Sequence, residues 1–290
     1  MSWTALGAVV FWGFSFIATK FALKEVHPFT LLFLRYAIGA LLLLLVQYGR
    51  DRGLLKIFSC RDWVQIFLLA LVGVSGLGLL QAYGLLYTTA INTGWIVAIN
   101  PILIILAARL LLGEVITIRK ISGIFLGFCG VFLIISKGVI SLSLFHSPSI
   151  VGDLLVLTSA LAWTTFTVIG KSFASRFTPL STSTAIMLSA AVITLPLIIL
   201  KGEWNKILSL SSPAWMSVFF LGVFCSGLAY LFWYSALEKK DSSVVGMYLY
   251  LEPIVTLVGA CLLLREEIHW TILLGGGMIL IGVYLASKRS

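Results

Sequence analysis

The chain has 290 residues, of which 60% are hydrophobic and only 11% are charged. Soluble domains carry about 25% charged residues, so this composition excludes a water-soluble globular protein and predicts that lipid surrounds much of the chain. The formal net charge of +9 does not indicate nucleic-acid binding, because the Lys and Arg residues lie in short clusters between long apolar runs, as in the loops of membrane proteins.

Ten apolar runs are long enough for membrane-spanning helices, which need about 20 largely apolar residues. The first five are expected at 3–23, 29–48, 63–87, 92–112 and 118–136. The other five are expected at 151–172, 180–200, 214–237, 243–264 and 270–286. The first run is longer than the apolar part of a signal peptide, so we expect it to be a retained helix.

The two halves of the chain repeat short motifs in the same order, which indicates an internal duplication. In the first half these motifs are Trp12 with Lys20, Ser75-Gly76-Leu77 with Tyr83, and Asn100-Pro101 with Gly113-Glu114. Their counterparts in the second half are Trp163 with Lys171, Ser226-Gly227-Leu228 with Tyr234, and Glu252-Pro253 with Arg265-Glu266. We therefore divide the chain into two repeats, residues 1–140 and 150–290.

Each repeat has an odd number of helices, so the second repeat must cross the membrane in the opposite sense. The predicted fold is an all-α integral membrane protein with ten transmembrane helices, arranged as two inverted five-helix repeats. Transporters use this architecture and hold their substrate near the midplane. Lys and Arg are twice as numerous on the side that holds both termini, and the positive-inside rule therefore places the termini in the cytoplasm.

These repeated motifs resemble a known family. Residues 83–90, Asn100-Pro101 and Leu111-Leu112-Gly113-Glu114 resemble the third and fourth helices of an EamA domain, and residues 233–237, 251–253 and 264–266 resemble the same pattern again. Tandem EamA domains are typical of the drug/metabolite transporter superfamily. The resemblance implies a ten-helix exporter or facilitator of amino acids, other metabolites or drugs in a bacterial inner membrane. The pattern usually has Gly-Glu where this chain has Arg265-Glu266, so we expect that helix end to be capped differently.

Trp12 and Trp163 lie at equivalent positions, well inside the first and sixth expected helices. Trp at a helix end anchors a protein at the membrane interface, but at these inner positions we expect both side chains to line the central cavity. The same argument selects weaker candidates, for which packing between helices is the alternative. These are Phe16, Gln81, Tyr83 and Tyr234.

Arg35 places a charge inside the second expected helix. The equivalent position of the second repeat is Ile186, so the repeat symmetry does not require the charge. A long side chain can carry its charged end to the membrane interface, and we slightly favour this interpretation over a role in substrate binding.

Asn100-Pro101 is expected inside the fourth helix, with Trp95 about one turn before it. An amide in the membrane needs hydrogen-bonding partners, and a proline-broken helix has carbonyl groups that substrate or water can meet. We therefore expect Asn100 and Trp95 to line the cavity.

Glu252, before Pro253, is the most unusual residue of the ninth expected helix. A carboxylate near the membrane centre costs about 2.5–3.5 kcal/mol on insertion scales, so it normally faces the bundle interior or a wet cavity. Tyr248, Thr256 and Gly259 share its helix face. We expect Glu252 and Tyr248 to contact substrate, with Glu252 binding a proton or a cationic group. The alternative is structural: Glu252 serves the backbone that Pro253 loosens, or pairs with a neighbour.

The sequence contains no HExxH, GxSxG or Walker motif, and its four cysteines and three histidines have no metal-like spacing. We therefore predict no enzymatic activity, no cofactor and no bound metal. The expected function is that of a secondary transporter or facilitator with alternating access to a small molecule. The alternative is a membrane scaffold or interaction protein without transport activity. Gly123, Gly127 and Gly275-Gly276-Gly277 predict close helix packing within the chain, and we expect a monomer or weak homodimer.

Overall fold

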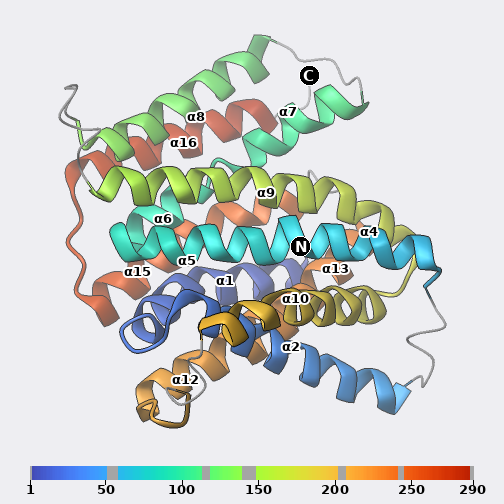
Figure 1. Ribbon diagram of the computed structural model, residues 1–290. Coiled ribbons are helices and arrows are strands. Elements are labelled where there is room, and N and C mark those ends of the chain that lie inside the picture. Colours follow the sequence, from blue (N-terminus) through green and yellow to red (C-terminus); the bar gives the residue numbers. More distant parts are fainter. Residues whose placement is uncertain are drawn as a thin grey trace.

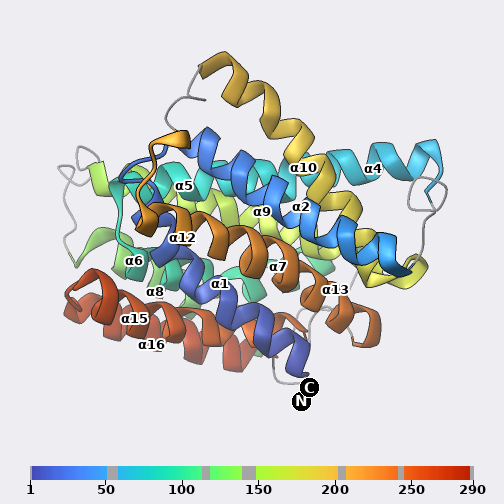
Figure 2. The same ribbon diagram turned by 90° about the horizontal axis from the view of Figure 1, so that it is seen from below.

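The computed structural model describes residues 2–50, 58–112, 118–138, 148–201, 207–240 and 245–287, and over these residues the only regular secondary structure is helical. Seven helical spans there are long and apolar enough to cross a membrane, and three shorter apolar helices accompany them. Together they coincide with the ten expected segments, which confirms the predicted all-α fold (Figures 1 and 2). Gly113 and Glu114 of the repeated motif lie outside the described residues.

The first repeat has five crossings, two of which are built from shorter pieces. They are α1 (Trp3–Ala22); α2 (Pro28–Arg50); α4 (Cys60–Ala70) continued by the π-helical η1 (Leu71–Gly76) and α5 (Leu77–Tyr87); α6 (Ala90–Val97) with α7 (Asn100–Leu112); and α8 (Ile118–Ser136). The second repeat follows the same plan. Its crossings are α9 (Pro148–Arg176); α10 (Pro179–Lys201); α12 (Ser212–Phe220) continued by the π-helical η3 (Leu221–Leu228) and α13 (Ala229–Lys239); the 3-10 helix η4 (Met247–Leu251), α15 (Glu252–Gly259) and the π-helical η5 (Ala260–Leu264); and α16 (Trp270–Ser287).

Capping residues explain where several helices begin. The Ser59 side chain accepts a hydrogen bond from the Asp62 backbone N–H, and the Asp62 side chain accepts one from the Ser59 backbone, which makes a capping box at the start of α4. Thr89 caps α6 and Ser211 caps α12 through their side-chain oxygens. Prolines occupy the first positions of α2, α9 and α10, where the missing N–H is tolerated.

The two proline motifs interrupt their crossings as expected. The chain leaves the helix at Ala98 and Ile99, directly before Asn100-Pro101. In the ninth crossing the 3-10 helix η4 ends at Leu251, and α15 begins at Glu252 with Pro253 in its first turn. Each interruption therefore places a buried polar residue, Asn100 or Glu252, at the start of a helix.

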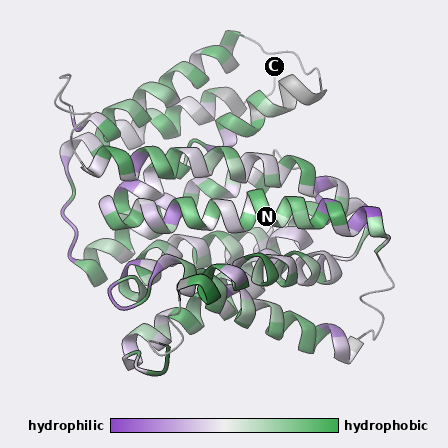
Figure 3. Ribbon diagram, viewed as in Figure 1, coloured by the Kyte–Doolittle hydropathy of each residue, from purple (hydrophilic) through white to green (hydrophobic). Residues whose placement is uncertain are grey.

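The outer surface of the bundle is apolar. Leu45, Phe125, Leu200 and Leu262 are each more than 60% exposed, and Figure 3 shows that hydrophobic residues make up much of the helices. Soluble monomers rarely expose large contiguous apolar patches. This apolar surface is therefore suited to contact with lipid.

Helices α8 and α16 lie side by side at one edge of the bundle (Figure 1). Glycines allow their backbones to approach: a Cβ atom added at Gly130 would lie 2.5 Å from the Gly275 carbonyl oxygen, and one added at Gly282 would lie 2.5 Å from that of Gly123. Small residues permit such close packing of membrane helices. The glycine contacts predicted for these two helices are thus made within the chain.

Candidate functional site

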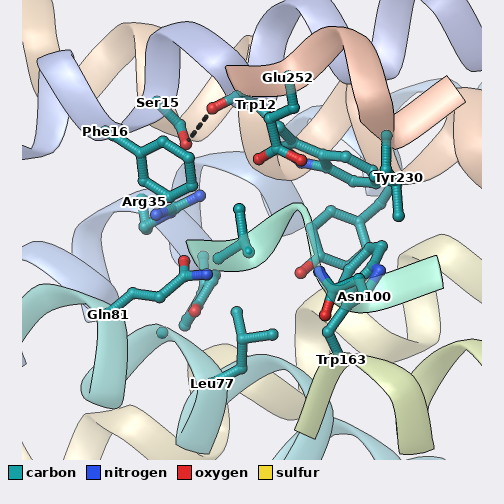
Figure 4. Close-up of a pocket in the computed structure, with 14 residues that line it drawn as sticks. Trp12, Ser15, Phe16, Arg35, Leu77, Gln81, Asn100, Trp163, Tyr230 and Glu252 are labelled. Atoms are coloured by element: carbon teal, nitrogen blue, oxygen red, sulfur yellow. Dashed lines mark hydrogen bonds between the residues drawn. The ribbon is translucent and has the colours of Figure 1, made fainter. Parts of the chain in front are cut away.

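A small polar cavity lies inside the bundle, between residues of both repeats (Figure 4). It offers about 40 Å³ to the centres of water molecules, which is room for a few waters. Six of the predicted site residues line it: Trp12, Phe16, Gln81, Asn100, Trp163 and Glu252. Side chains that the sequence patterns did not select complete the lining, among them Ser15, Tyr36, Leu77, Tyr230 and Leu249. The cavity must widen before it can hold a metabolite.

Glu252 brings a carboxylate to this cavity. It is 6% exposed and is the first residue of α15. Within the described part of the chain, its carboxylate accepts no hydrogen bond and forms no ion pair. The alternative interpretation, that Glu252 pairs with a neighbouring side chain, therefore finds no such partner among the described residues.

Arg35 brings a cation to the same cavity. Its Nε donates a hydrogen bond to Ser226 Oγ at 3.0 Å, and its guanidinium lies 5.5 Å from the centre of the Tyr36 ring. The expected extension of Arg35 to the membrane interface is therefore wrong, because a hydroxyl group and a polar cavity accommodate the guanidinium inside the bundle.

Aromatic side chains from both repeats form one wall of the cavity. The rings of Trp12 and Trp163 meet edge to face with centroids 4.9 Å apart, and Trp12 also meets Tyr230 at 5.5 Å and Trp233 at 5.3 Å. Edge-to-face contacts of this kind stabilise aromatic pairs beyond their buried area. The equivalence of Trp12 and Trp163 in the sequence thus corresponds to a direct contact where the repeats meet.

Two of the π-helical segments, η1 and η3, orient cavity residues. Tyr36 donates its hydroxyl proton to the Val74 carbonyl in η1 at 2.8 Å, and Trp12 Nε1 donates to the Cys225 carbonyl in η3 at 3.0 Å. Insertions of π geometry alter the regular backbone bonding of a helix and are frequent at functional sites. The repeated motifs Ser75-Gly76 and Ser226-Gly227 lie in these segments, so the repeat was the sequence signal for them, although it did not reveal the π geometry.

Asn100 adds an amide to the cavity from the start of α7. Its side chain is 4% exposed, and its Oδ1 atom has no hydrogen-bond partner among the described residues. Trp163 Nε1 is likewise buried and without a described partner. Buried polar groups are usually hydrogen-bonded, so these two atoms are candidate contacts for a bound molecule.

The other four predicted site residues lie elsewhere. Trp95 packs against Gly276 of α16, where an added Cβ would meet its ring at 2.7 Å, and Tyr83 contacts His27 and Phe29 near the start of α2. Tyr234 is buried beside Phe166 with its hydroxyl facing Gly170. The Tyr248 hydroxyl accepts a hydrogen bond from the Ser2 backbone at 2.6 Å.

Tyr248, Glu252, Thr256 and Gly259 form a polar stripe along the ninth crossing, and most of this stripe contacts α1. Thr256 Oγ1 is 2.9 Å from the Gly13 carbonyl oxygen, to which it donates, and Gly259 is close to Phe14 and Ile17. Together with the contact of Tyr248 to Ser2, these interactions fix α15 and η4 along α1. Glu252 is the member of the stripe that reaches the cavity.

One end of the bundle is held by the Lys20–Glu266 cluster, which comprises Lys20, Ala90, Ile91 and Glu266. The Glu266 carboxylate is 3.2 Å from Lys20 Nζ and accepts hydrogen bonds from the backbone N–H groups of Ala90 at 2.9 Å and Ile91 at 3.0 Å. A carboxylate at a helix N-terminus is stabilised by the unsatisfied N–H groups there. The cluster thus ties the end of α1 and the segment after η5 to the start of α6.

Asp153 strengthens this end of the bundle from α9. It is fully buried and accepts hydrogen bonds from the Thr88 hydroxyl and, at 3.4 Å, from the Asn92 amide, directly beside the start of α6. Asp153, like Glu252, is a buried carboxylate within an apolar helix, and the sequence patterns did not single it out.

The expected difference in capping at Arg265 is not found. Arg265 has φ 55° and ψ 35°, the left-handed conformation in which helices commonly end and which glycine adopts without strain. The backbone therefore keeps the form that a glycine would give, and it directs the chain so that Glu266 reaches α6.

Different contacts hold the opposite end, where α4 begins and α9 ends. Arg176 donates to Asp62 at 2.9 Å, and Lys171 donates to the carbonyl oxygens of Leu237 and, at 2.8 Å, Lys240. The two ends of the cavity-lining helices are thus closed by separate sets of polar contacts.

Comparison with known proteins gives a consistent result. The model of the EamA-like transporter family matches residues 1–136 and again 150–288. An uncharacterized transporter of Archaeoglobus fulgidus is 32% identical, over 97% of this chain and 95% of that protein. The uncharacterized transporter YyaM of Bacillus subtilis is 29% identical, over 97% and 92%. A solved crystal structure has the same fold, with a TM-score of 0.71 at 19% identity over 100% of this chain and 98% of its own.

Proposed function

The chain belongs to the EamA-like transporter family, and we propose that it is a secondary transporter or facilitator that carries a small metabolite by alternating access through the central cavity. Membership makes it a multi-pass membrane transporter rather than an enzyme. The proposal covers amino acids, related compounds and drugs as substrate classes.

One observation carries this proposal: buried polar groups of both repeats surround a single cavity. Asn100 comes from the first repeat and Glu252 from the second, and each is at most 6% exposed. Polar and charged groups inside a membrane are costly and usually mark a pathway for substrate or ions. Helix packing alone gives no reason to gather them in one place.

Alternating access requires that each end of the cavity can close independently. The Lys20–Glu266 cluster joins α1, α6 and the segment after η5 at one end, while Arg176 and Asp62 pair at the other. Breaking one set leaves the other intact, because the two sets share no residue. This separation supports a cycle in which the ends open in turn.

Membrane orientation is part of the proposal. We place both termini and the loop between Arg50 and Arg61 in the cytoplasm of a bacterial inner membrane, with residues 1–140 and 150–290 as the two EamA domains. Single cysteines introduced at Ser2, at Ser290 and in the loop between Arg50 and Arg61 should react with an impermeant thiol reagent only from the cytoplasmic face. Labelling of the two termini from opposite faces would contradict the helix count and the inverted repeat.

Transport itself is tested with purified protein in liposomes. We expect saturable counterflow of at least one member of a panel of labelled metabolites, and we expect Asn100→Ala to reduce it while the variant remains folded by size-exclusion chromatography. Protein-free liposomes are the control. Counterflow by no member of a broad panel would favour the scaffold alternative.

A further inference from the structure

We propose that Asp153 is a proton-binding site, separate from the central cavity, whose protonation is linked to closure of the end held by the Lys20–Glu266 cluster. The proposal goes beyond the transport function and depends on no particular substrate. Asp153 is fully buried in α9, which lies beside α5 and α6 (Figure 1), and it is not among the residues that line the central cavity. Ionisable residues inside membrane-spanning helices are costly and often mark proton pathways.

The Asp153 carboxylate faces the turn between α5 and α6. Helices α5 and α9 meet backbone to backbone here, because a Cβ atom added at Gly152 would lie 2.7 Å from the Gly84 carbonyl oxygen and 2.9 Å from the Thr88 nitrogen. Asp153 therefore emerges directly against this turn, where the side chains of Thr88 and Asn92 are each 5% exposed. In this closed form, the bundle shields the carboxylate from bulk water.

Asp153 has too few partners for an ionised carboxylate. Its Oδ1 accepts hydrogen bonds from the Thr88 hydroxyl and, at 3.4 Å, from the Asn92 amide, whereas Oδ2 has no partner among the described residues. None of the described cations forms an ion pair with it. An ionised carboxylate without such compensation is very costly in a dry interior, and a group of this kind takes up a proton instead.

The Thr88 hydroxyl can receive that proton in a hydrogen bond. A hydroxyl oxygen has two lone pairs and accepts as well as donates. Protonated Asp153 can therefore donate to Thr88 Oγ1, which lies 3.4 Å from the Asn92 amide nitrogen and can accept from it too. The protonated form keeps the three side chains bonded and leaves only an uncharged oxygen of Asp153 without a partner.

Few other titratable groups approach Asp153 from the helices packed against α9. Lys137, just after α8, is the charged residue whose electrostatic attraction reaches it among the described residues, although the two form no ion pair. The Tyr87 side chain of α5 lies beside Gly152, and α6 and η1 contain no titratable residue. The titratable side chains of α4 and α13 contact α9 farther along, through Asp62 with Arg176 and through Tyr230 and Tyr234 with Phe166.

Asp153 and Glu266 hold the same turn from two sides. Glu266 accepts hydrogen bonds from the backbone N–H groups of the first two residues of α6, while Asp153 binds Thr88 just before them and Asn92 just after them. Opening of this end moves the start of α6 and lets water reach Asp153. Water stabilises the ionised form, so the proton leaves to the solution on this side and returns when the end closes.

Infrared spectroscopy of the full chain in liposomes tests the site directly, because a protonated carboxyl group absorbs apart from a carboxylate. Spectra are recorded at about pH 6, where exposed carboxylates with their usual pKa values of about 4 remain ionised. We expect the parent protein to show a band from a buried protonated carboxyl group. Asp153→Asn should remove this band, and Thr88→Val, which removes its hydrogen-bond partner, should shift it. Glu252→Gln, which removes the carboxylate of the central cavity, should leave this band in place.

Two variants of the cluster separate closure from direct electrostatics. Glu266→Gln removes a nearby negative charge and Lys20→Gln a nearby positive one, and both remove the ion pair that helps to hold this end. If closure retains the proton, both variants should weaken the Asp153 band at the same pH. Direct electrostatic effects alone would weaken the band in Glu266→Gln and strengthen it in Lys20→Gln. Arg176→Gln, at the other end of the bundle, should not weaken it.

Several results overturn the proposal. A parent spectrum without a protonated carboxyl band, or a band that Thr88→Val does not shift, excludes Asp153 as the proton site, and both results are obtained even if Asp153→Asn does not fold. Opposite responses of Lys20→Gln and Glu266→Gln exclude the link to closure. Because these spectra need no substrate, counterflow without the band leaves the transport function standing, and the band without counterflow leaves this proposal standing.

Discussion

Removing the charge of Glu266 should open the cavity at the end that the Lys20–Glu266 cluster holds. The carboxylate accepts two backbone hydrogen bonds, from Ala90 and Ile91, and pairs with Lys20, with the two charged side chains only 24% and 11% exposed. Glu266→Gln keeps one acceptor oxygen and loses the other acceptor and the charge. Since hydrogen bonds to charged groups contribute about 1.5–3 kcal/mol each, we expect this end to lose about 2 kcal/mol of closing free energy. That corresponds to a roughly 30-fold larger population of the open form.

Thiol labelling measures this population. Ser15 lines the cavity and is 7% exposed, so Ser15→Cys in a background with Cys60, Cys129, Cys225 and Cys261 replaced by Ala reports access from either face. Glu266→Gln should raise the labelling rate by an impermeant reagent added from the Lys20 side. Arg176→Gln is the matched control at the other end, where the arginine side chain is 55% exposed, and it should not raise that rate. Equal rates in Glu266→Gln and the parent, with both proteins folded, would refute the gating role of the cluster.

Three further predictions concern stability. Trp12→Phe should lower the melting temperature in detergent more than Trp163→Phe, by the equivalent of about 1–3 kcal/mol, because it leaves the buried Cys225 carbonyl without the Trp12 donor while Trp163 Nε1 has no described partner; equal shifts would show that this hydrogen bond is unimportant. Arg265→Gly should raise stability by about 0.5–1 kcal/mol in thermal unfolding, because it relieves a left-handed backbone without creating a contact; a decrease would mean that the Arg265 side chain has a stabilising role. Gly130→Leu should prevent close packing of α8 on α16, since even a Cβ would lie 2.5 Å from the Gly275 carbonyl, and should reduce folded yield on size-exclusion chromatography, whereas Gly277→Leu, where a Cβ meets nothing within 4 Å, should not.

Hydropathy and repetition predicted the crossings because both are properties of the sequence along the chain. The apolar runs marked the ten segments, and Asn100-Pro101 marked the interruption between α6 and α7, since proline and the residue before it disfavour a continuous helix. The equivalence of Trp12 and Trp163 also had a direct spatial consequence, because equivalent positions of inverted repeats meet near the axis that relates them.

Which side chains point into the cavity was much harder to predict. A membrane helix is apolar all round, so its sequence carries little information on how it is rotated about its own axis. Tyr234 and Trp95 therefore could not be distinguished from Trp12 and Trp163, although they pack against Phe166 and Gly276 outside the cavity.

Arg35 was misplaced for a different reason. Its partner Ser226 lies 191 positions away in the sequence, and it lies in the π-helical segment η3, whose geometry no residue pattern announced. Long-range contacts to irregular backbone are where sequence patterns carry least information.

Blocking the cavity while flux is recorded tests the central claim most directly. In the Ser15→Cys protein without native cysteines, a bulky thiol reagent should abolish counterflow of a transported metabolite, and saturating metabolite should slow the labelling of Ser15→Cys. The parent without Ser15→Cys should keep its flux under the same treatment. Unchanged counterflow after complete labelling of Ser15→Cys would contradict transport through this cavity.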